Sequence, residues 1–149
     1  MKNRQHLPLG TSFMKNLLST HFTIPETNNT IRDFIDFIYL SQIHQAVAVK
    51  VQTESYRQAM SDINEVGEGM TMGALYWQLN DVWQAPSWSS IDYDGRWKML
   101  HYYAADFFAP IIVTYKAEGN NVSAYIVSEK LYPIINATLE IDLYSFDEM

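Results

Sequence analysis

The sequence predicts an α/β segment of a larger protein, in which a helix, a strand and a second helix precede the first strands of an antiparallel β domain. Three observations predict this: a long apolar stripe at helical spacing, one near-continuous apolar run of strand length, and alternation of apolar and polar residues after Pro110. Neither half is complete, because one buried parallel strand cannot form a sheet and three antiparallel strands make half a sandwich. We therefore expect a fragment of a longer protein, with a boundary near Pro110.

The composition is that of a globular protein and excludes several classes of function. The 149 residues are 48% hydrophobic, and 10 basic against 17 acidic side chains give a net charge of −7. This length allows a real core, and the apolar content excludes disorder. An acidic chain without clustered Lys or Arg argues against a nucleic-acid partner. The longest near-apolar run, residues 107–113, is too short to cross a membrane.

The motif inventory indicates neither a metal nor any other cofactor. There is no cysteine, and none of the four histidines stands at metal-ligand spacing from an acidic residue. No G-x-S-x-G and no Gly-rich phosphate loop is present. The polar amino terminus shows no signal peptide, yet three possible N-glycosylation sequons, at Asn28, Asn121 and Asn136, favour the secretory route.

The first half of the chain is predicted to be helical after an irregular start. Residues 1–29 suggest a loop with a short helix around residues 13–18. Thr30 and Asp33 then form a variant of the capping box, which predicts a helix start. An apolar stripe follows at helical spacing: Ile31, Phe34, Ile35, Ile38, Ile43, Val47 and Val51. Since this helix would exceed the usual length, we expect a break near residues 39–41.

The second half combines a buried strand, a long loop, a helix and a β region. Residues 70–77 are nearly all apolar, as in a strand buried on both faces. Residues 78–94 form a long polar and aromatic loop ending in an Asp94–Gly95 turn, and residues 96–108 show helical periodicity up to Pro110. Strands are then expected at residues 111–115, 122–127 and 137–144.

All four tryptophans lie within 21 residues, beginning where the apolar strand ends: Trp77, Trp83, Trp88 and Trp97. Amide and carboxylate side chains stand among them, including Asn80 and Asp81. An indole offers an apolar face to a sugar ring, while amides and carboxylates bond its hydroxyls. Ligands of α/β barrels meet the carboxyl ends of strands, so this position favours sugar binding. The alternative is that the indoles pack the core, which the helical periodicity favours for Trp97.

The segment Met72-Gly-Ala-Leu-Tyr-Trp-Gln-Leu-Asn-Asp-Val-Trp-Gln-Ala-Pro-Ser-Trp-Ser-Ser-Ile91 closely resembles the animal lysosomal β-mannosidases, which are family-2 glycoside hydrolases. The resemblance continues through residues 95–104 and 106–110, and shorter similar segments precede it in the same order, at residues 4–6, 36–42 and 54–57. It covers residues from about 4 to 115. Asp94 departs from it, because relatives have glycine there.

This resemblance implies a retaining exo-hydrolase of the lysosome that removes terminal β-D-mannose from the non-reducing end of oligosaccharides or glycoprotein-derived glycans. It implies that residues 1–110 are the C-terminal part of a (β/α)8 TIM barrel, with its last strand and helices. Residues 111–149 would be the first strands of an Ig-like β-sandwich. The rest of the barrel would be required as a partner, and no membrane or nucleic-acid partner is implied.

The resemblance also assigns roles to the tryptophan cluster. Trp77 would be the aromatic floor of the subsite for the cleaved mannose, and Asn80 and Asp81 would shape its rim. Trp83 and Trp88 would line or support it. No catalytic residue is expected in this chain, because retaining glycosidases need two carboxyl groups about 5 Å apart and both glutamates lie on earlier strands. The isolated chain is therefore expected to be inactive. The alternative function is a non-catalytic carbohydrate-binding or interaction remnant that keeps the aromatic platform.

Overall fold

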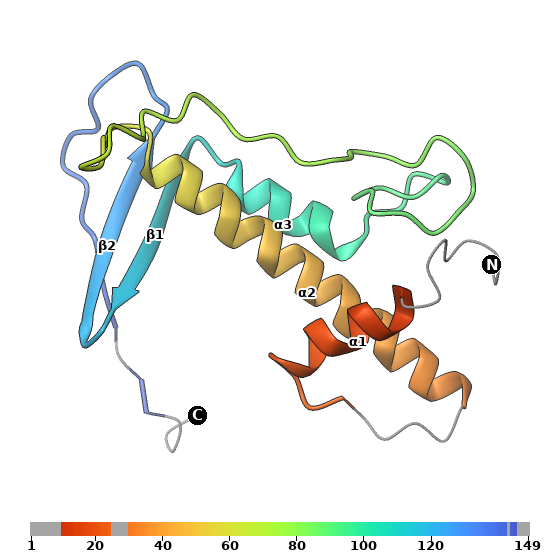
Figure 1. Cartoon of the computed structure of the whole chain (residues 1–149). Coiled ribbons are helices and arrows are strands. Elements are labelled where there is room, and N and C mark those ends of the chain that lie inside the picture. Colours follow the sequence, from red (N-terminus) through yellow and green to blue (C-terminus); the bar gives the residue numbers. More distant parts are fainter. Residues whose placement is uncertain (1–9, 25–29, 143, 146–149) are drawn as a thin grey trace.

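The computed structural model describes residues 10–24, 30–142 and 144–145 and contains three helices and one β-hairpin in this part of the chain. The elements are α1 (Gly10–Ser19), α2 (Ile31–Gln58), α3 (Met99–Phe107), β1 (Ile111–Glu118) and β2 (Asn121–Ser128). Figure 1 shows α2 as the long axis of the molecule, with α3 beside it and α1 across its amino-terminal half. The β-hairpin lies at the carboxyl end of α2.

Helix α2 begins at the predicted capping box. The Asp33 backbone N–H donates to the Thr30 hydroxyl at 3.2 Å, and the Thr30 N–H donates to the Asp33 carboxylate at 2.9 Å. The predicted break near residues 39–41 is wrong, because α2 runs unbroken over 28 residues. No glycine or proline interrupts it, and the Ser41 hydroxyl donates to the Ile38 carbonyl one turn back at 2.8 Å. The helix α1 confirms the short helix expected at residues 13–18.

The core is small and lies between α2 and α3. Ala46 of α2 is fully buried against Leu100, Ala104 and Phe107 of α3. Tyr76, from the segment before the tryptophan cluster, packs against this core with its ring edge-on to that of Phe107. Because alanine has no side chain beyond Cβ, the two helices approach closely here.

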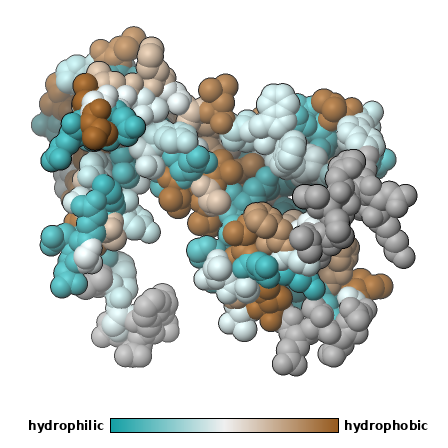
Figure 2. Space-filling model, in the orientation of Figure 1, coloured by the Kyte–Doolittle hydropathy of each residue, from teal (hydrophilic) through white to brown (hydrophobic). Residues whose placement is uncertain are grey.

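Much of the apolar surface of the described chain is exposed. Ile31 and Val51 of the predicted α2 stripe are 80% and 60% exposed, and Figure 2 shows apolar residues on the surface over both ends of the molecule. Residues 70–77 form an extended segment and not the expected buried strand. That prediction is wrong for the described chain, because no strand in it lies alongside to complete the hydrogen bonds.

The β-hairpin confirms two of the three predicted strands. β1 and β2 pair antiparallel, from Ile111 opposite Ser128 to Glu118 opposite Asn121. The turn uses Gly119 at φ +60°, a conformation that suits glycine. The third strand, expected at residues 137–144, is absent from its described residues, which lie exposed without a pairing partner, so the observed sheet has two strands.

A buried arginine ties the carboxyl ends of α2, α3 and β2 together. Arg57 is 5% exposed, and its Nη1 donates to the Phe107 carbonyl at 2.6 Å. Its Nη2 lies 3.1 Å from the Glu129 carboxylate, an ion pair without hydrogen-bond geometry. The adjacent Gln58 donates to the Thr114 hydroxyl of β1 at 3.1 Å. The last turn of α2 therefore sets where the hairpin starts.

We expect Arg57→Met to lower the free energy of unfolding by about 1–3 kcal/mol, because the Phe107 carbonyl and the Glu129 carboxylate lose their partner. Thermal or urea unfolding followed by helical circular dichroism measures this change. The matched control is Arg32→Met, at an exposed i,i+4 ion pair with Asp36, which should stay within about 0.5 kcal/mol. Equal effects of the two variants would contradict the bridging role of Arg57.

Candidate functional site

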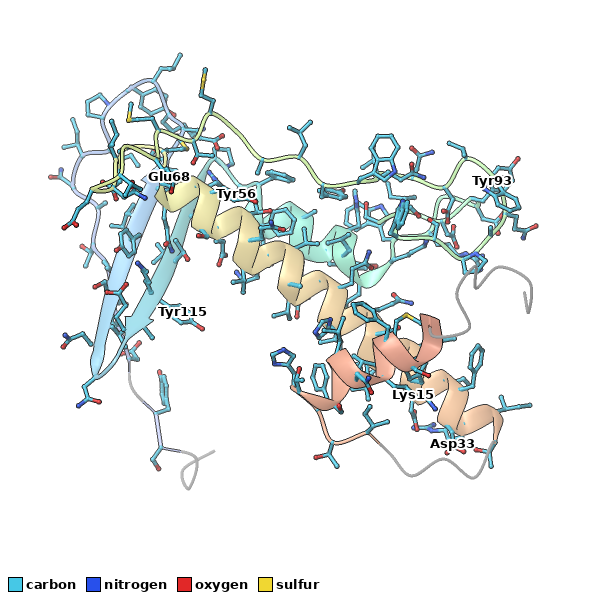
Figure 3. All side chains as sticks on the ribbon, in the orientation of Figure 1. Lys15, Asp33, Tyr56, Glu68, Tyr93 and Tyr115 are labelled. Atoms are coloured by element: carbon cyan, nitrogen blue, oxygen red, sulfur yellow. The ribbon has the colours of Figure 1, made fainter. Side chains whose placement is uncertain are left out.

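Residues 78–94, here called the Trp-rich loop, carry Trp83 and Trp88 and fold back on themselves next to the amino end of α3, while Trp77 directly precedes the loop and Trp97 follows it. Its two halves are joined by backbone hydrogen bonds, from the Ile91 N–H to the Leu79 carbonyl and from the Asp81 N–H to the Ile91 carbonyl, both 2.9 Å. Figure 3 shows Tyr93 of this loop at the opposite side of the molecule from Tyr115 of β1. The candidate site and the hairpin are therefore well separated.

Asp81 is the buried centre of this loop. It is 6% exposed, its carboxylate accepts a hydrogen bond from the Ser87 hydroxyl, and the Lys98 Nζ donates to it at 3.0 Å. The Lys98 Nζ also donates to the Ser89 hydroxyl oxygen at 2.7 Å. Burial raises the pKa of the Asp81 carboxyl, but the hydrogen bonds from Ser87 and Lys98 outweigh it and hold that pKa below its ordinary value of 3.8.

The fully buried Ser90 connects the Trp-rich loop to the core. The Ser90 hydroxyl donates to the Leu79 carbonyl at 2.8 Å and lies 2.8 Å from the Tyr76 hydroxyl and 3.0 Å from His101 Nδ1. A serine oxygen donates once and accepts twice, so this arrangement suits a Tyr76 hydroxyl and a His101 N–H that both donate to it. The loop is thus attached to the Tyr76 side of the core and to α3.

The side chains predicted to contact a sugar occupy different environments. Trp77 is 74% exposed, and Trp83 is also exposed. Asn80 is exposed too, and its amide donates to the Asp81 carbonyl at 3.1 Å. Asp81 is buried beneath them. Three of the four predicted residues therefore present accessible surface, while the carboxylate of the fourth is turned to the protein interior.

The other two tryptophans have different neighbours, Trp88 beside α2 and Trp97 beside α3. Trp88 is exposed, and its carbonyl accepts a hydrogen bond from Gln45 of α2 at 2.9 Å. It also lines a groove of about 590 Å³ between the loop, α1 and α2. Trp97 does not lie on the buried face of a helix, because α3 begins only at Met99. Half-exposed, Trp97 packs edge-on against His101 at 4.3 Å between ring centroids, which corrects the core-packing expectation.

The predicted Asp94–Gly95 turn is confirmed. Gly95 has φ +84°, and the Asp92 carboxylate accepts from the backbone N–H of Asp94 at 3.0 Å and of Arg96 at 2.8 Å. The Arg96 Nε donates to the same carboxylate at 2.7 Å. Hydrogen bonds from Arg96 hold the pKa of Asp92 below its ordinary value. Asp94 accepts from Arg96 as well, so an aspartate is accommodated where the resemblance has glycine.

Two predicted sequons are described by the structure. Asn121 is the first residue of β2 and Asn136 has φ +59°, and both are exposed. Asn28 lies outside the described residues. Among the described residues no group of three His, Asp or Glu side chains could hold a metal ion. No helix in that part of the chain is long and apolar enough to span a membrane.

Sequence reasoning missed the polar side chains that support the loop from beneath. Lys98 lies three residues after the Asp94–Gly95 turn, and Ser87, Ser89 and Ser90 stand among tryptophans, so none carries a recognisable motif. The signal that was available is the density of small hydroxyl residues close to Asp81. Short hydroxyl side chains are good local partners for a buried carboxylate and for loop backbone.

Comparison with known proteins relates the chain to glycoside hydrolases. It is 54% identical over 110 residues to "Beta-mannosidase" of Bos taurus and 35% identical over 162 residues to "Probable beta-mannosidase" of Caenorhabditis elegans. These matches cover 74% and 98% of the chain, but only 12% and 18% of those relatives. The crystal structure of a β-D-mannosidase from Dictyoglomus thermophilum superposes with a TM-score of 0.66 at 31% identity, over 83% of this chain and 14% of that one.

Within the glycoside hydrolases, the chain is homologous to a segment of β-mannosidases, which confirms the resemblance inferred from its residues. No protein-family model matches the sequence. The chain spans about an eighth of the length of the mammalian relatives. A stretch of 110 residues within 149 must include residues 40–110, so the match to the bovine protein contains the whole Trp-rich loop.

We expect the Asp81–Lys98 pair to survive mild acid. The pKa of Asp81 is lower in the folded chain than its unfolded value near 3.8. The pair's contribution to stability is therefore complete above the unfolded pKa, and it is lost as the pH falls through the lower pKa of the folded chain. Amide exchange of Asp81 and Ile91, corrected for intrinsic rates, should match at about pH 7 and pH 5 and should rise only below about pH 4. An Asp81→Asn variant should lack this rise in exchange rate below about pH 4. Loss of protection already at pH 5 would contradict the prediction.

Proposed function

We propose that this chain supplies part of the sugar pocket of a retaining β-mannosidase, which hydrolyses terminal non-reducing β-D-mannose residues of oligosaccharides and glycoprotein-derived glycans. The observation that carries the proposal is the 54% identity to the bovine "Beta-mannosidase" over a 110-residue match that includes the Trp-rich loop. Identity at this level over a match that includes the loop and α3 favours a common substrate. By the same resemblance the enzyme would act in the lysosome, where exposed sequons such as Asn121 would carry glycans.

In this proposal the exposed side chains of the loop contact the sugar and the buried ones support them. The indole of Trp77 stacks on the apolar C–H face of the mannose ring, and the Asn80 amide bonds a hydroxyl at the rim. Trp83 lines the pocket. Asp81 shapes the rim from below, because its carboxylate is already engaged by Ser87 and Lys98.

We further propose that residues 1–110 belong to the C-terminal part of a (β/α)8 barrel and residues 111–149 to the start of an Ig-like β-sandwich. The exposed α2 stripe and the unpaired segment at residues 70–77 support this, since both offer apolar surface or backbone groups that a larger sheet would cover. The hairpin that starts at Ile111 supports a boundary at Pro110.

The proposal assigns no catalytic carboxylate to this chain. A retaining glycosidase needs an acid/base and a nucleophile about 5 Å apart, facing the scissile bond. The carboxylate nearest the exposed indoles in sequence, Asp81, is buried and ion-paired, so it is suited neither to proton transfer nor to attack. Both glutamates would come from strands that precede this segment.

The direct test compares two proteins. The longest product encoded by the gene that contains this segment should hydrolyse p-nitrophenyl β-D-mannoside and leave the α-mannoside intact, while the 149-residue chain should hydrolyse neither. Robust hydrolysis by the 149-residue chain would contradict the assignment of the carboxylates to other strands. A mannose-dependent change in tryptophan fluorescence of an inactive long product would favour the non-catalytic binding remnant instead.

In the active product, we expect Trp77→Ala to lower kcat/KM for the β-mannoside by at least about a hundredfold, because the sugar loses its stacking surface. Asn80→Ala should lower it by about tenfold or more through loss of one hydroxyl contact. Tyr132→Ala is the matched control, since it removes an exposed aromatic ring outside the loop, and it should leave the kinetics unchanged. Normal kinetics for Trp77→Ala or for Asn80→Ala would show that the substituted residue is not part of the pocket.

A further inference from the structure

We infer that Lys98 is a positioning residue of the sugar site. Its ammonium group, largely shielded from water and paired with the buried Asp81, fixes the Trp-rich loop to the amino end of α3 and thereby sets the orientation in which Asn80 meets the sugar. This inference rests on the proposed function. It deepens that function by naming what holds the rim of the pocket in place.

The first support is that all three N–H donors of the Lys98 ammonium group are used within the loop. They reach the Asp81 carboxylate at 3.0 Å, the Ser89 hydroxyl oxygen at 2.7 Å and the Ser87 carbonyl at 3.4 Å. An ammonium group has three donors, so no hydrogen bond is left for solvent or ligand. One side chain therefore links three separate positions of a loop that has no regular secondary structure.

The second support is that Asp81 is buried and Lys98 is largely shielded from water. The side chain of Asp81 is 4% exposed and that of Lys98 is 19% exposed. A charge pair shielded from water is screened less than a surface pair, and removing one partner leaves the other desolvated without compensation. Such a pair resists separation, in contrast to the exposed pair of Lys116 and Glu118 on the hairpin.

The third support is that Lys98 itself is fixed to the rigid part of the molecule. It is the N-cap residue of α3, and its backbone N–H donates to the Ser90 carbonyl at 2.8 Å. The next residue, Met99, donates its N–H to the Gln42 side chain of α2 at 3.3 Å. The ammonium group is thus attached to the packed α2–α3 pair, whose core begins two residues further along the chain at Leu100.

The ion pair is connected to the proposed sugar-binding side chains through Asn80. Asp81 directly follows Asn80, whose amide donates to the Asp81 carbonyl at 3.1 Å. The Asp81 N–H is bonded to Ile91 on the returning half of the loop. If the carboxylate is released, both the side chain and the peptide that hold Asn80 lose their anchor. The exposed Asn80 has no buried packing of its own to replace it.

The test uses Lys98→Met, which keeps the unbranched apolar part of the side chain and removes the ammonium group. Amide exchange of the longest gene product that contains this segment should show at least tenfold faster exchange at Asp81, Ser90 and Ile91 in Lys98→Met than in the wild type, with the core helix α2 unchanged. The matched control Lys116→Met removes an exposed, paired lysine and should leave these amides unaffected. Unchanged exchange in Lys98→Met would overturn the inference.

The second measurement separates positioning from stability alone. In the longest gene product, Lys98→Met should raise KM for p-nitrophenyl β-D-mannoside at least fivefold and lower kcat. Fewer folded molecules would lower the apparent kcat with KM unchanged, and that result would overturn the inference. Lys98→Arg, which keeps the charge, should have a KM between those of the wild type and Lys98→Met.

A double variant tests the pairing itself. In Asp81→Asn/Lys98→Met both charges are absent, so its exchange rates should rise less than the two single effects combined. Full additivity would overturn the assignment of Asp81 as the partner. If the wild-type long product hydrolyses no β-mannoside, the proposed function fails, and the inference fails with it. That outcome is distinguishable because the wild type, and not only the variant, is inactive.

Discussion

The contact between α2 and α3 at Ala46 is the interaction on which the rest of the structure depends. It places a nine-residue helix against a long one, and each end of the short helix carries a different part of the molecule. At the amino end, Lys98 holds the Trp-rich loop. At the carboxyl end, the Phe107 carbonyl is held by Arg57, and the hairpin begins four residues later. A helix too short to be stable alone thus fixes both the candidate site and the β-hairpin.

The exposed apolar surface follows from a second constraint, the need of a strand for neighbours. The segment at residues 70–77 has the composition of a buried strand, but backbone groups in a sheet must pair with another strand, and the described chain offers none. The α2 stripe likewise has the right spacing and too little to pack against. Both features agree with a chain that spans about an eighth of its mammalian relatives.

Sequence reasoning succeeded where structure is determined locally. The capping box at Thr30, the turn at Gly95 and the hairpin around Gly119 each depend on residues a few positions apart, and all three were predictable. It failed where the outcome depends on a distant partner, as for the strands expected at residues 70–77 and 137–144. The tryptophans and Asn80 were visible as a pattern. Lys98 was not, because its role exists only once the loop has folded back over α3.

In the candidate site, the side chains that would bind a sugar are different from the side chains that hold the loop in place. Trp77 and Asn80 are exposed and have little packing of their own, which leaves their surfaces free for a ligand but makes their positions depend on what lies beneath. The groups beneath them are bonded to one another: the Lys98 ammonium group, largely shielded from water, donates to the buried Asp81 carboxylate and to the buried Ser89 hydroxyl oxygen. A carboxylate in this loop therefore does not indicate acid–base catalysis. Its environment, and not its residue type, gives it a supporting role.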